Sequence, residues 1–346
     1  MFHAIALGAV VFALVVAGHA SRTRADAVAD FYRGRTLQMV VGHEAGTGFD
    51  FYGRALARHI GRHIPGHPTL VPQNMVGAVG LVAANWLYNV APKDGTVMAI
   101  FAHTAPLEPL LGQGAGKFDA QRFTWIGNMD EAVGVCGVWH ATGITTFEQL
   151  ATREVLVGAS GSGTAGPFSQ SPTALKNLFG ARFRLVQGYK GSAEMKLAML
   201  RGEVEGICGL PLSTLRSEWK ELWAGGEYRL LLQLSRTRHP ALAQVPHVFD
   251  LARTPEERQT LDLVFGVQAL GRPIAAPPGL PPERAAALRR AFMATMQDPV
   301  FLAEARDIQL DLAPISGEAL TDLIAQFYAS PRTIVERARK AIRPAP

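Results

Sequence analysis

The chain has 346 residues, of which 48% are hydrophobic and 18% charged, and its formal net charge is +5 at pH 7. This length predicts two lobes, and the hydrophobic content excludes a disordered chain. The basic residues are scattered and carry no interleaved aromatic cluster, so we expect no nucleic-acid partner. Arg54, Arg58 and Arg62 recur at helical spacing on the first long helix, which predicts a solvated basic stripe.

The N-terminal segment predicts export. Residues 5–18 form an apolar run that is shorter than the roughly 20 residues a bilayer span needs and that suits a signal-peptide core. Small residues at 18–20 and at 25–27 offer two cleavage positions, so we assign residues 1–27 to a signal peptide. An uncleaved anchor is the alternative. No cysteine follows the run, which argues against a lipoprotein.

Short apolar runs alternate with helical patterns in the first third of the chain. Strands are predicted at 37–41, 69–71 and 96–101, and helices at 51–64 and 81–88. Such alternation is typical of a parallel sheet covered by helices.

A second alternating series follows an extended region at 123–140. Its predicted helices lie near 147–150, at 174 and at 192–200, and its predicted strands lie at 155, 183–186, 205–208 and 229–234. We therefore expect a discontinuous first lobe, at 28–135 plus 230–346, around a second lobe at 136–229.

The C-terminal part is predicted to return to the first lobe. Proline-rich connections, including residues 275–279, precede a helix that starts at Pro281–Pro282. Ser316 is placed to cap the last long helix.

Two glycine-rich loops each join a predicted strand to a predicted helix. The first reads AGTGFD at 45–50, and the second reads ASGSGT at 159–164. Such loops leave backbone N–H groups free at a helix N-terminus, where the helix dipole favours an anion. Two of them indicate two lobes that hold an anionic ligand between them.

The familiar catalytic and cofactor motifs fail on inspection. Residues 161–166 match the dinucleotide pattern, but no acid follows near 186–188, and Phe168 and Pro172 delay the helix. A Walker lysine and a nucleophile elbow are both missing from the sequence. His59 and His63 share a helical face without an acid nearby, which favours a solvated or packed pair over a metal site. We expect no cofactor, no metal and no enzyme activity.

The two cysteines, Cys136 and Cys208, lie in apolar, strand-like runs. A disulfide between them is compatible with an exported chain. Two buried free thiols are the alternative, because sequence spacing does not give the separation of the two Cα atoms.

Five segments, taken in order and spacing, resemble the solute receptors of tripartite tricarboxylate transporters, the Bug-type binding proteins. They are residues 46–50 with the following Arg/Ala-rich helix, the NMVGAVG turn at 74–80, the PKDGT turn at 92–96, the SGT loop at 162–164, and YKGSA at 189–193 followed by LRGEV at 200–204.

The resemblance implies a monomeric α/β protein with the two-lobed, Venus-flytrap fold of periplasmic binding proteins. Its ligand would be a small organic carboxylate held in the cleft between the lobes and passed to membrane permease subunits. A binding module that feeds a sensor is an alternative, and an exported enzyme is a weaker one.

The family's binding loops map onto residues of both lobes. The implied ligand-binding residues are Gly46, Thr47, Gly48 and Asp50 in the first loop, Ser160, Ser162, Gly163 and Thr164 in the second, and His103, Thr104, Tyr189 and Gly209 at other strand ends. Asp50 would cap the first helix or accept a hydrogen bond from the ligand.

The first loop departs from the family pattern, because His43-Glu44-Ala45 stands where a proline and glycines are usual. A cleft-facing Glu44 would oppose a second carboxylate on the ligand and favour an amine or a hydroxyl. An outward-facing Glu44 would merely solvate the loop.

Overall fold

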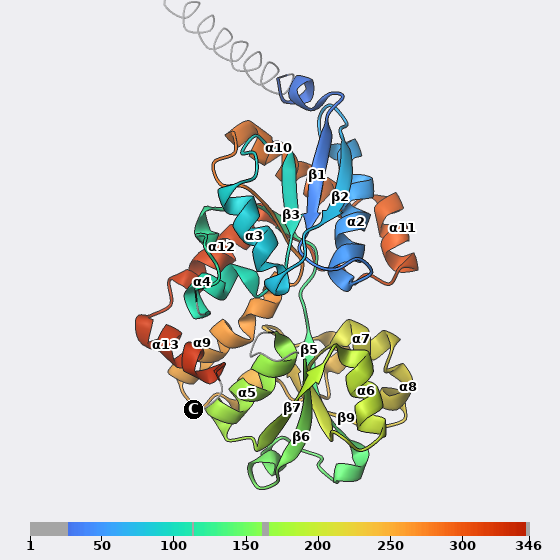
Figure 1. Ribbon diagram of the computed structural model, residues 1–346, viewed down its shortest axis with the longest axis vertical. Helices are drawn as coiled ribbons and strands as arrows, with labels where there is room; N and C mark the ends of the chain where they lie inside the picture. The colour runs from blue at the N-terminus through green and yellow to red at the C-terminus, as the bar shows by residue number, and fades with distance from the viewer. Residues whose placement is uncertain (1–26, 113, 161–165, 344–346) are drawn as a thin grey trace, which may run out of the picture.

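The computed structural model describes residues 27–112, 114–160 and 166–343 and shows two α/β lobes, one above the other in Figure 1. The predicted fold class is confirmed. Its strands are β1 (Thr36–Val41), β2 (Thr69–Asn74), β3 (Val97–Ile100), β4 (Thr124–Asn128), β5 (Gly134–Trp139), β6 (Val155–Ser160), β7 (Phe183–Tyr189), β8 (Gly206–Pro211), β9 (Tyr228–Leu234), β10 (Pro273–Ala276) and β11 (Ile315–Ser316).

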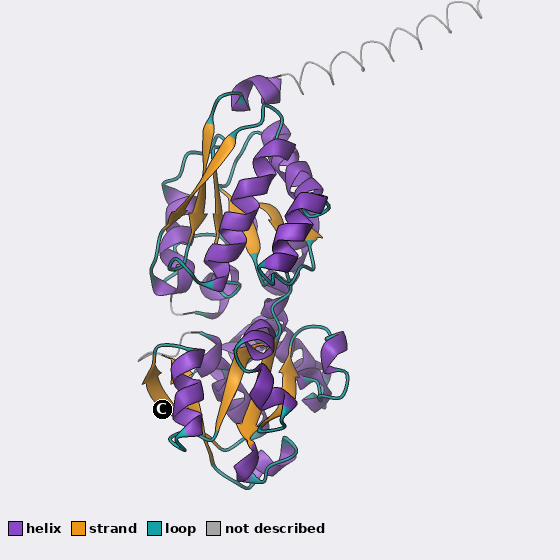
Figure 2. Cartoon of the chain, turned by 90° about the vertical axis from the view of Figure 1, so that its right-hand side faces the viewer, coloured by secondary structure: helices purple, strands orange, loops and turns teal. Residues whose placement is uncertain are grey.

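The helices cover the faces of both sheets (Figure 2). They are α2 (Gly48–Ile60), α3 (Leu81–Asn89), α4 (Glu108–Leu111), α5 (Pro167–Phe179), α6 (Ser192–Leu200), α7 (Leu212–Ser217), α8 (Lys220–Ala224), α9 (Pro255–Val264), α10 (Pro282–Thr295), α11 (Pro299–Asp307), α12 (Gly317–Tyr328) and α13 (Arg332–Ala341). Each helix of the described residues is too short or too polar to span a lipid bilayer.

The upper lobe is built on a six-stranded sheet in the order β11-β4-β10-β3-β1-β2. Strands β1, β2 and β3 are parallel, so their carboxyl ends meet at one edge. Alternation along β1 sends Val40 into the core on one face and Met39 and Val41 into the core on the other. Both faces are therefore buried, as in a sheet that helices cover on each side.

The lower lobe is built on a five-stranded sheet in the order β7-β6-β8-β5-β9. Strand β6 runs parallel to β7 and β8, whereas β5 runs antiparallel to β8 and β9. The chain stays in this sheet until Leu234, although we expected it to return to the first lobe at residue 230. The boundary lies after residue 230 because β9 pairs with β5, which is far away in the sequence. Local sequence patterns do not show which distant strands pair.

Two local expectations are wrong. Helix α5 begins at Pro167 and contains Pro172, so neither Phe168 nor Pro172 delays it. Pro167 occupies the first helical turn, where its missing N–H costs nothing. The proline-rich stretch near 275 contains strand β10, which pairs with β3 and β4 in the middle of the upper sheet.

The two cysteines lie opposite each other on neighbouring strands of the lower sheet. Cys136 on β5 and Cys208 on β8 are register partners, are fully buried and form a disulfide. Pairing of the two strands brings together residues 72 positions apart in the sequence.

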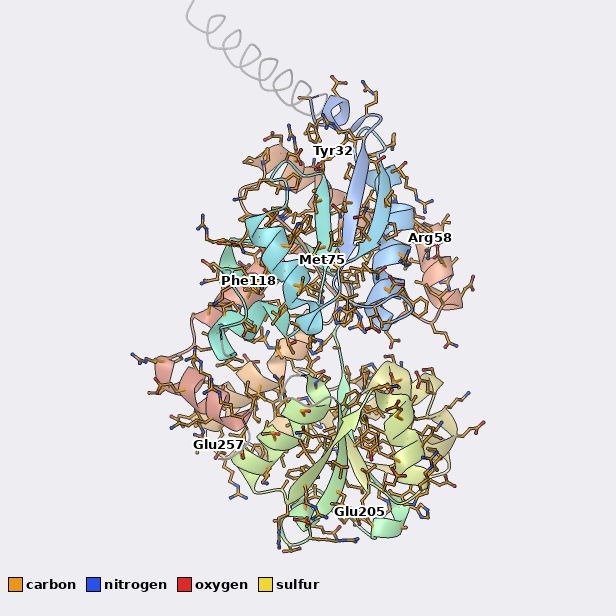
Figure 3. All side chains as sticks on the ribbon, in the orientation of Figure 1. Tyr32, Arg58, Met75, Phe118, Glu205 and Glu257 are labelled. Carbon is orange, nitrogen blue, oxygen red and sulfur yellow. A yellow bond between two sulfur atoms is a disulfide. The ribbon has the colours of Figure 1, made fainter. Side chains whose placement is uncertain are left out.

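The basic stripe of α2 is not simply solvated. Arg58 and Arg62 form ion pairs with Glu304 and Asp298, at α11 and its N-cap. Figure 3 places Arg58 on the outer side of the upper lobe, beside α11 and away from the lower lobe. His59 and His63 contact the same two acids at 2.5 and 2.8 Å, so the histidines are a packed pair.

Candidate functional site

A cavity of about 480 Å³ lies between the two lobes. It is lined by segments that follow the carboxyl ends of β1, β3 and β8, and by the chain segments that cross from one lobe to the other. In open α/β sheets, ligands bind outside the carboxyl ends of the strands. Two segments that cross between the lobes, at 130–134 and 268–272, and a loop of the lower lobe at 237–240 supply much of the lining.

Arg272 is held at the wall of this cavity, directly before β10. Its backbone N–H donates to the Asn128 side chain at 2.8 Å, and its Nη1 donates to the Gly271 carbonyl at 2.8 Å. The guanidinium carbon lies 4.4 Å from the centre of the Phe49 ring and 4.8 Å from that of Tyr52. Two aromatic faces thus hold the cation by cation–π attraction.

No carboxylate of the described residues forms an ion pair with the Arg272 guanidinium. Its Nε is buried and makes no hydrogen bond there, and none of the ion pairs found in those residues includes Arg272. A partly buried cation without a partner is costly, and a guanidinium binds a carboxylate through two parallel hydrogen bonds. The arrangement suits an organic anion.

Two histidines beside Arg272 are neutral at pH 7. Burial, with the nearby Arg272 charge as a second cause, lowers the pKa of His43 to about 4 and that of His103 to about 3. His43 also stacks on Phe49, with ring centres 4.0 Å apart. Each Nδ1 is buried without a partner in the described part of the chain, so both imidazoles can offer a hydrogen bond to a ligand.

The cavity also contains a carboxyl group that titrates near neutrality. Burial raises the pKa of Asp130 to about 7; the Arg272 charge opposes this rise, and the Asp311 charge adds to it. The Tyr52 hydroxyl lies 2.7 Å from the Asp311 carbonyl oxygen and 3.4 Å from Asp130 Oδ2. The single hydroxyl proton is best placed for the shorter contact, so Asp130 gains little stabilisation from Tyr52.

The structure brings some of the sequence-predicted residues to the cavity. His103, Thr104 and Gly209 line it. Gly209 has a φ of +85°, and a Cβ there would lie 2.4 Å from the Pro167 carbonyl oxygen, so the close approach of α5 requires glycine.

Other predicted residues are not among those that line it: Gly46, Thr47, Gly48, Asp50 and Tyr189. Ser160 and Tyr189 are register partners at the ends of β6 and β7. Ser162, Gly163 and Thr164 lie outside the described residues, as does the expected signal peptide up to residue 26.

Asp50 organises the first loop from within. It is 3% exposed and accepts hydrogen bonds from Gly46 N, Arg54 Nε and Asn74 Nδ2 at 2.8–2.9 Å. The N-cap of α2 is Thr47 rather than Asp50. Because its oxygens are already used, Asp50 fixes the loop and is not free to accept from a ligand.

Sequence reasoning missed Arg272 and Asp130. Neither lies in a glycine-rich loop, and each sits on a segment that joins the lobes. The only local signal at Arg272 is a charge at the start of the apolar run that becomes β10. Glu44, which the sequence left open, is exposed and is not a lining residue of the cavity.

Comparisons with known proteins support the fold. No family model matches the sequence. The chain is 22% identical to the "UPF0065 protein in gbd 5′ region" of Cupriavidus necator, over 97% of each chain.

Several solved structures are similar to this chain over most of its length. A TctC solute-binding protein from Polaromonas matches with a TM-score of 0.68 and 20% identity, over 90% of this chain and 99% of the other. The periplasmic binding protein BugD matches with a TM-score of 0.63 and 20% identity, over 90% of this chain and 98% of the other. An R. palustris protein solved with adipate also has a TM-score of 0.63 and 20% identity, over 88% of this chain and 97% of the other. The resemblance to Bug-type receptors is confirmed, and with it the two-lobed fold.

Proposed function

We propose that this chain is a periplasmic solute-binding protein that captures a small organic carboxylate between its lobes. The observation that carries the proposal is Arg272, an unpaired guanidinium held on two aromatic rings inside a 480 Å³ cavity. A similar structure contains adipate, a carboxylate, which supports this ligand class. We infer that the ligand's carboxylate lies on Arg272, with the neutral His43 and His103 as further partners.

Closure of the lobes would trap the ligand. Arg272 and Asp130 lie on the two lining segments that cross between the lobes, whereas His103 and Gly209 belong to opposite lobes. A ligand that touches both lobes binds the closed form more tightly than the open one, and this difference in affinity drives closure.

The remaining parts of the proposal follow from the resemblance. The protein would work as a monomer in the periplasm after removal of residues 1–27, and it would deliver its ligand to permease subunits of a tripartite tricarboxylate-type transporter. It would bind its ligand without chemical conversion.

Isothermal titration against acetate, hexanoate, adipate, malate and citrate tests the proposal. We expect at least one of these carboxylates to bind and to raise the melting temperature. If none of these carboxylates binds and none raises the melting temperature, the function is not carboxylate capture.

Variants of Arg272 locate the carboxylate. Arg272→Gln is expected to weaken binding of the best ligand at least about 30-fold, because a buried charge pair loses one partner. Arg272→Lys is expected to restore part of the affinity, since it keeps the charge but not the planar fork. Arg332→Gln, at an arginine whose side chain is 92% exposed, is the matched control and should bind as the wild type does. Unchanged binding by Arg272→Gln would place the carboxylate elsewhere.

A further inference from the structure

A second cavity, of about 110 Å³, adjoins the cleft. Val79 and Thr104 line both cavities, so the two cavities are neighbours at these residues. The second cavity extends between the upper lobe and helix α9, on the side of the molecule where α4, α9 and α13 gather in Figure 1.

The second cavity is lined mainly by apolar side chains. Leu107, Leu111, Leu263, Val264 and Val267 face it from α4, α9 and their neighbouring turns. Its one carboxylate among the lining residues, Glu108, already accepts hydrogen bonds from the backbone N–H groups of Ala115 and Gly116. The space therefore favours a hydrocarbon group over a charged or strongly solvated one.

Among the described residues that line the cleft, Arg272 is the one arginine or lysine without an ion-pair partner. Arg238, the other arginine there, is paired with Asp250 at 2.6 Å. His43 and His103 are neutral at pH 7, as described above. Glu131 and Asp311 add carboxylates to the lining, with Arg216 at 3.4 Å from Asp311, and Asp130 becomes charged as the pH rises through 7. These groups disfavour a second ligand carboxylate.

We propose that the ligand is a monocarboxylate with an apolar chain or ring, whose carboxylate binds Arg272 and whose apolar part passes Val79 into the second cavity. The inference rests on the proposed function and names its ligand class. A cavity of about 150 Å³ can hold a benzene molecule, so the smaller space here fits a short alkyl group or part of a ring.

Matched ligands test the inference on the unmodified protein. Hexanoate and adipate share a six-carbon chain and differ in one terminal carboxylate, whereas acetate has the carboxylate without the chain. We expect hexanoate to bind at least tenfold more tightly than adipate, and affinity to rise by up to about fourfold for each buried methylene in the series from acetate to hexanoate.

The outcomes separate the two proposals. Adipate binding as tightly as hexanoate or tighter would overturn the monocarboxylate assignment and leave carboxylate capture standing. Affinity that does not change from acetate to hexanoate would overturn the apolar subsite. Failure of every carboxylate to bind would overturn the proposed function and this inference with it.

Filling the second cavity provides an independent test. Val264→Phe, on α9, is expected to weaken hexanoate binding at least fivefold and to leave acetate binding unchanged. Val300→Phe, at an α11 valine that is 58% exposed, is the matched control and should alter neither ligand. Equal hexanoate affinity in Val264→Phe and the wild type would show that the chain does not enter this cavity. The ligand series on the wild type decides the question if Val264→Phe does not fold.

Discussion

Asn128 holds Arg272 in place: the Asn128 Oδ1 accepts the backbone N–H of Arg272 at 2.8 Å. The Asn128 Nδ2 donates to the carbonyl oxygens of Asp130 at 2.7 Å and Ala269 at 3.0 Å. One side chain, 1% exposed, therefore ties together two of the segments that cross between the lobes. These are the segments that bring Arg272 and Asp130 to the cleft.

Asn128→Ala is expected to lower the free energy of unfolding by about 3 kcal/mol, because three buried backbone groups lose their partner. Urea unfolding measures the change. Asn89→Ala removes two hydrogen bonds from an exposed side chain and should cost less than about 1 kcal/mol. Similar losses in the two variants would contradict a special role for Asn128.

Asp130 is expected to make stability fall as pH rises. Burial raises its pKa to about 7, above the usual value of 3.8, so the folded state holds a proton that the unfolded state releases. This stabilising contribution is complete below pH 3.8 and is lost as the pH rises through 7. It is of the order of 2–4 kcal/mol.

Asp130→Asn isolates this contribution. His43 and His103, whose pKa values are lowered, give the opposite slope below pH 6.5, so the variant is compared with the wild type at each pH. From pH 5 to pH 8, the unfolding free energy of Asp130→Asn should rise relative to that of the wild type. A difference that stays constant over this range would show that Asp130 does not titrate there.

Val79 is expected to be a strained residue. Its φ is +55° and that of Ala78 is +46°, a left-handed conformation that a β-branched side chain disfavours. Val79→Gly should therefore raise the unfolding free energy by about 1 kcal/mol, the relief of strain exceeding the gain in unfolded-chain entropy. Val71→Gly, in β2 and similarly exposed, should lower it by about 0.5–1 kcal/mol. Changes of the same sign in both variants would contradict the strain.

The Cys136–Cys208 disulfide is expected to stabilise the lower lobe. It links residues 72 positions apart, and the double variant Cys136→Ala/Cys208→Ala should lose about 4 kcal/mol in urea unfolding. Ligand affinity should stay unchanged, because neither cysteine lines the cleft. Wild-type protein treated with a reductant is the matched comparison and should lose a similar amount. Equal stability with and without the disulfide would contradict the prediction.

The fold class and most of the strands and helices can be predicted from the amino-acid sequence. Hydrophobic periodicity is local, so the alternation of strands and helices from Leu37 to Leu234 could be read directly from the chain. Glycine-rich turns such as 46–50 and 74–80 carried the resemblance for the same reason. His103 and Thr104, which the resemblance implied, follow β3 and line the cleft because residues after parallel strands meet at one edge of a sheet.

The tertiary structure alone decided the chemistry of the cleft. Arg272 meets Phe49 and Tyr52 because β10 inserts between β3 and β4, a pairing that no local pattern reports. Asp130 and the two histidines owe their pKa values to burial, which depends on how the crossing segments pack. Sequence patterns indicated a site for an anion; long-range packing determined which cation lies there and what surrounds it.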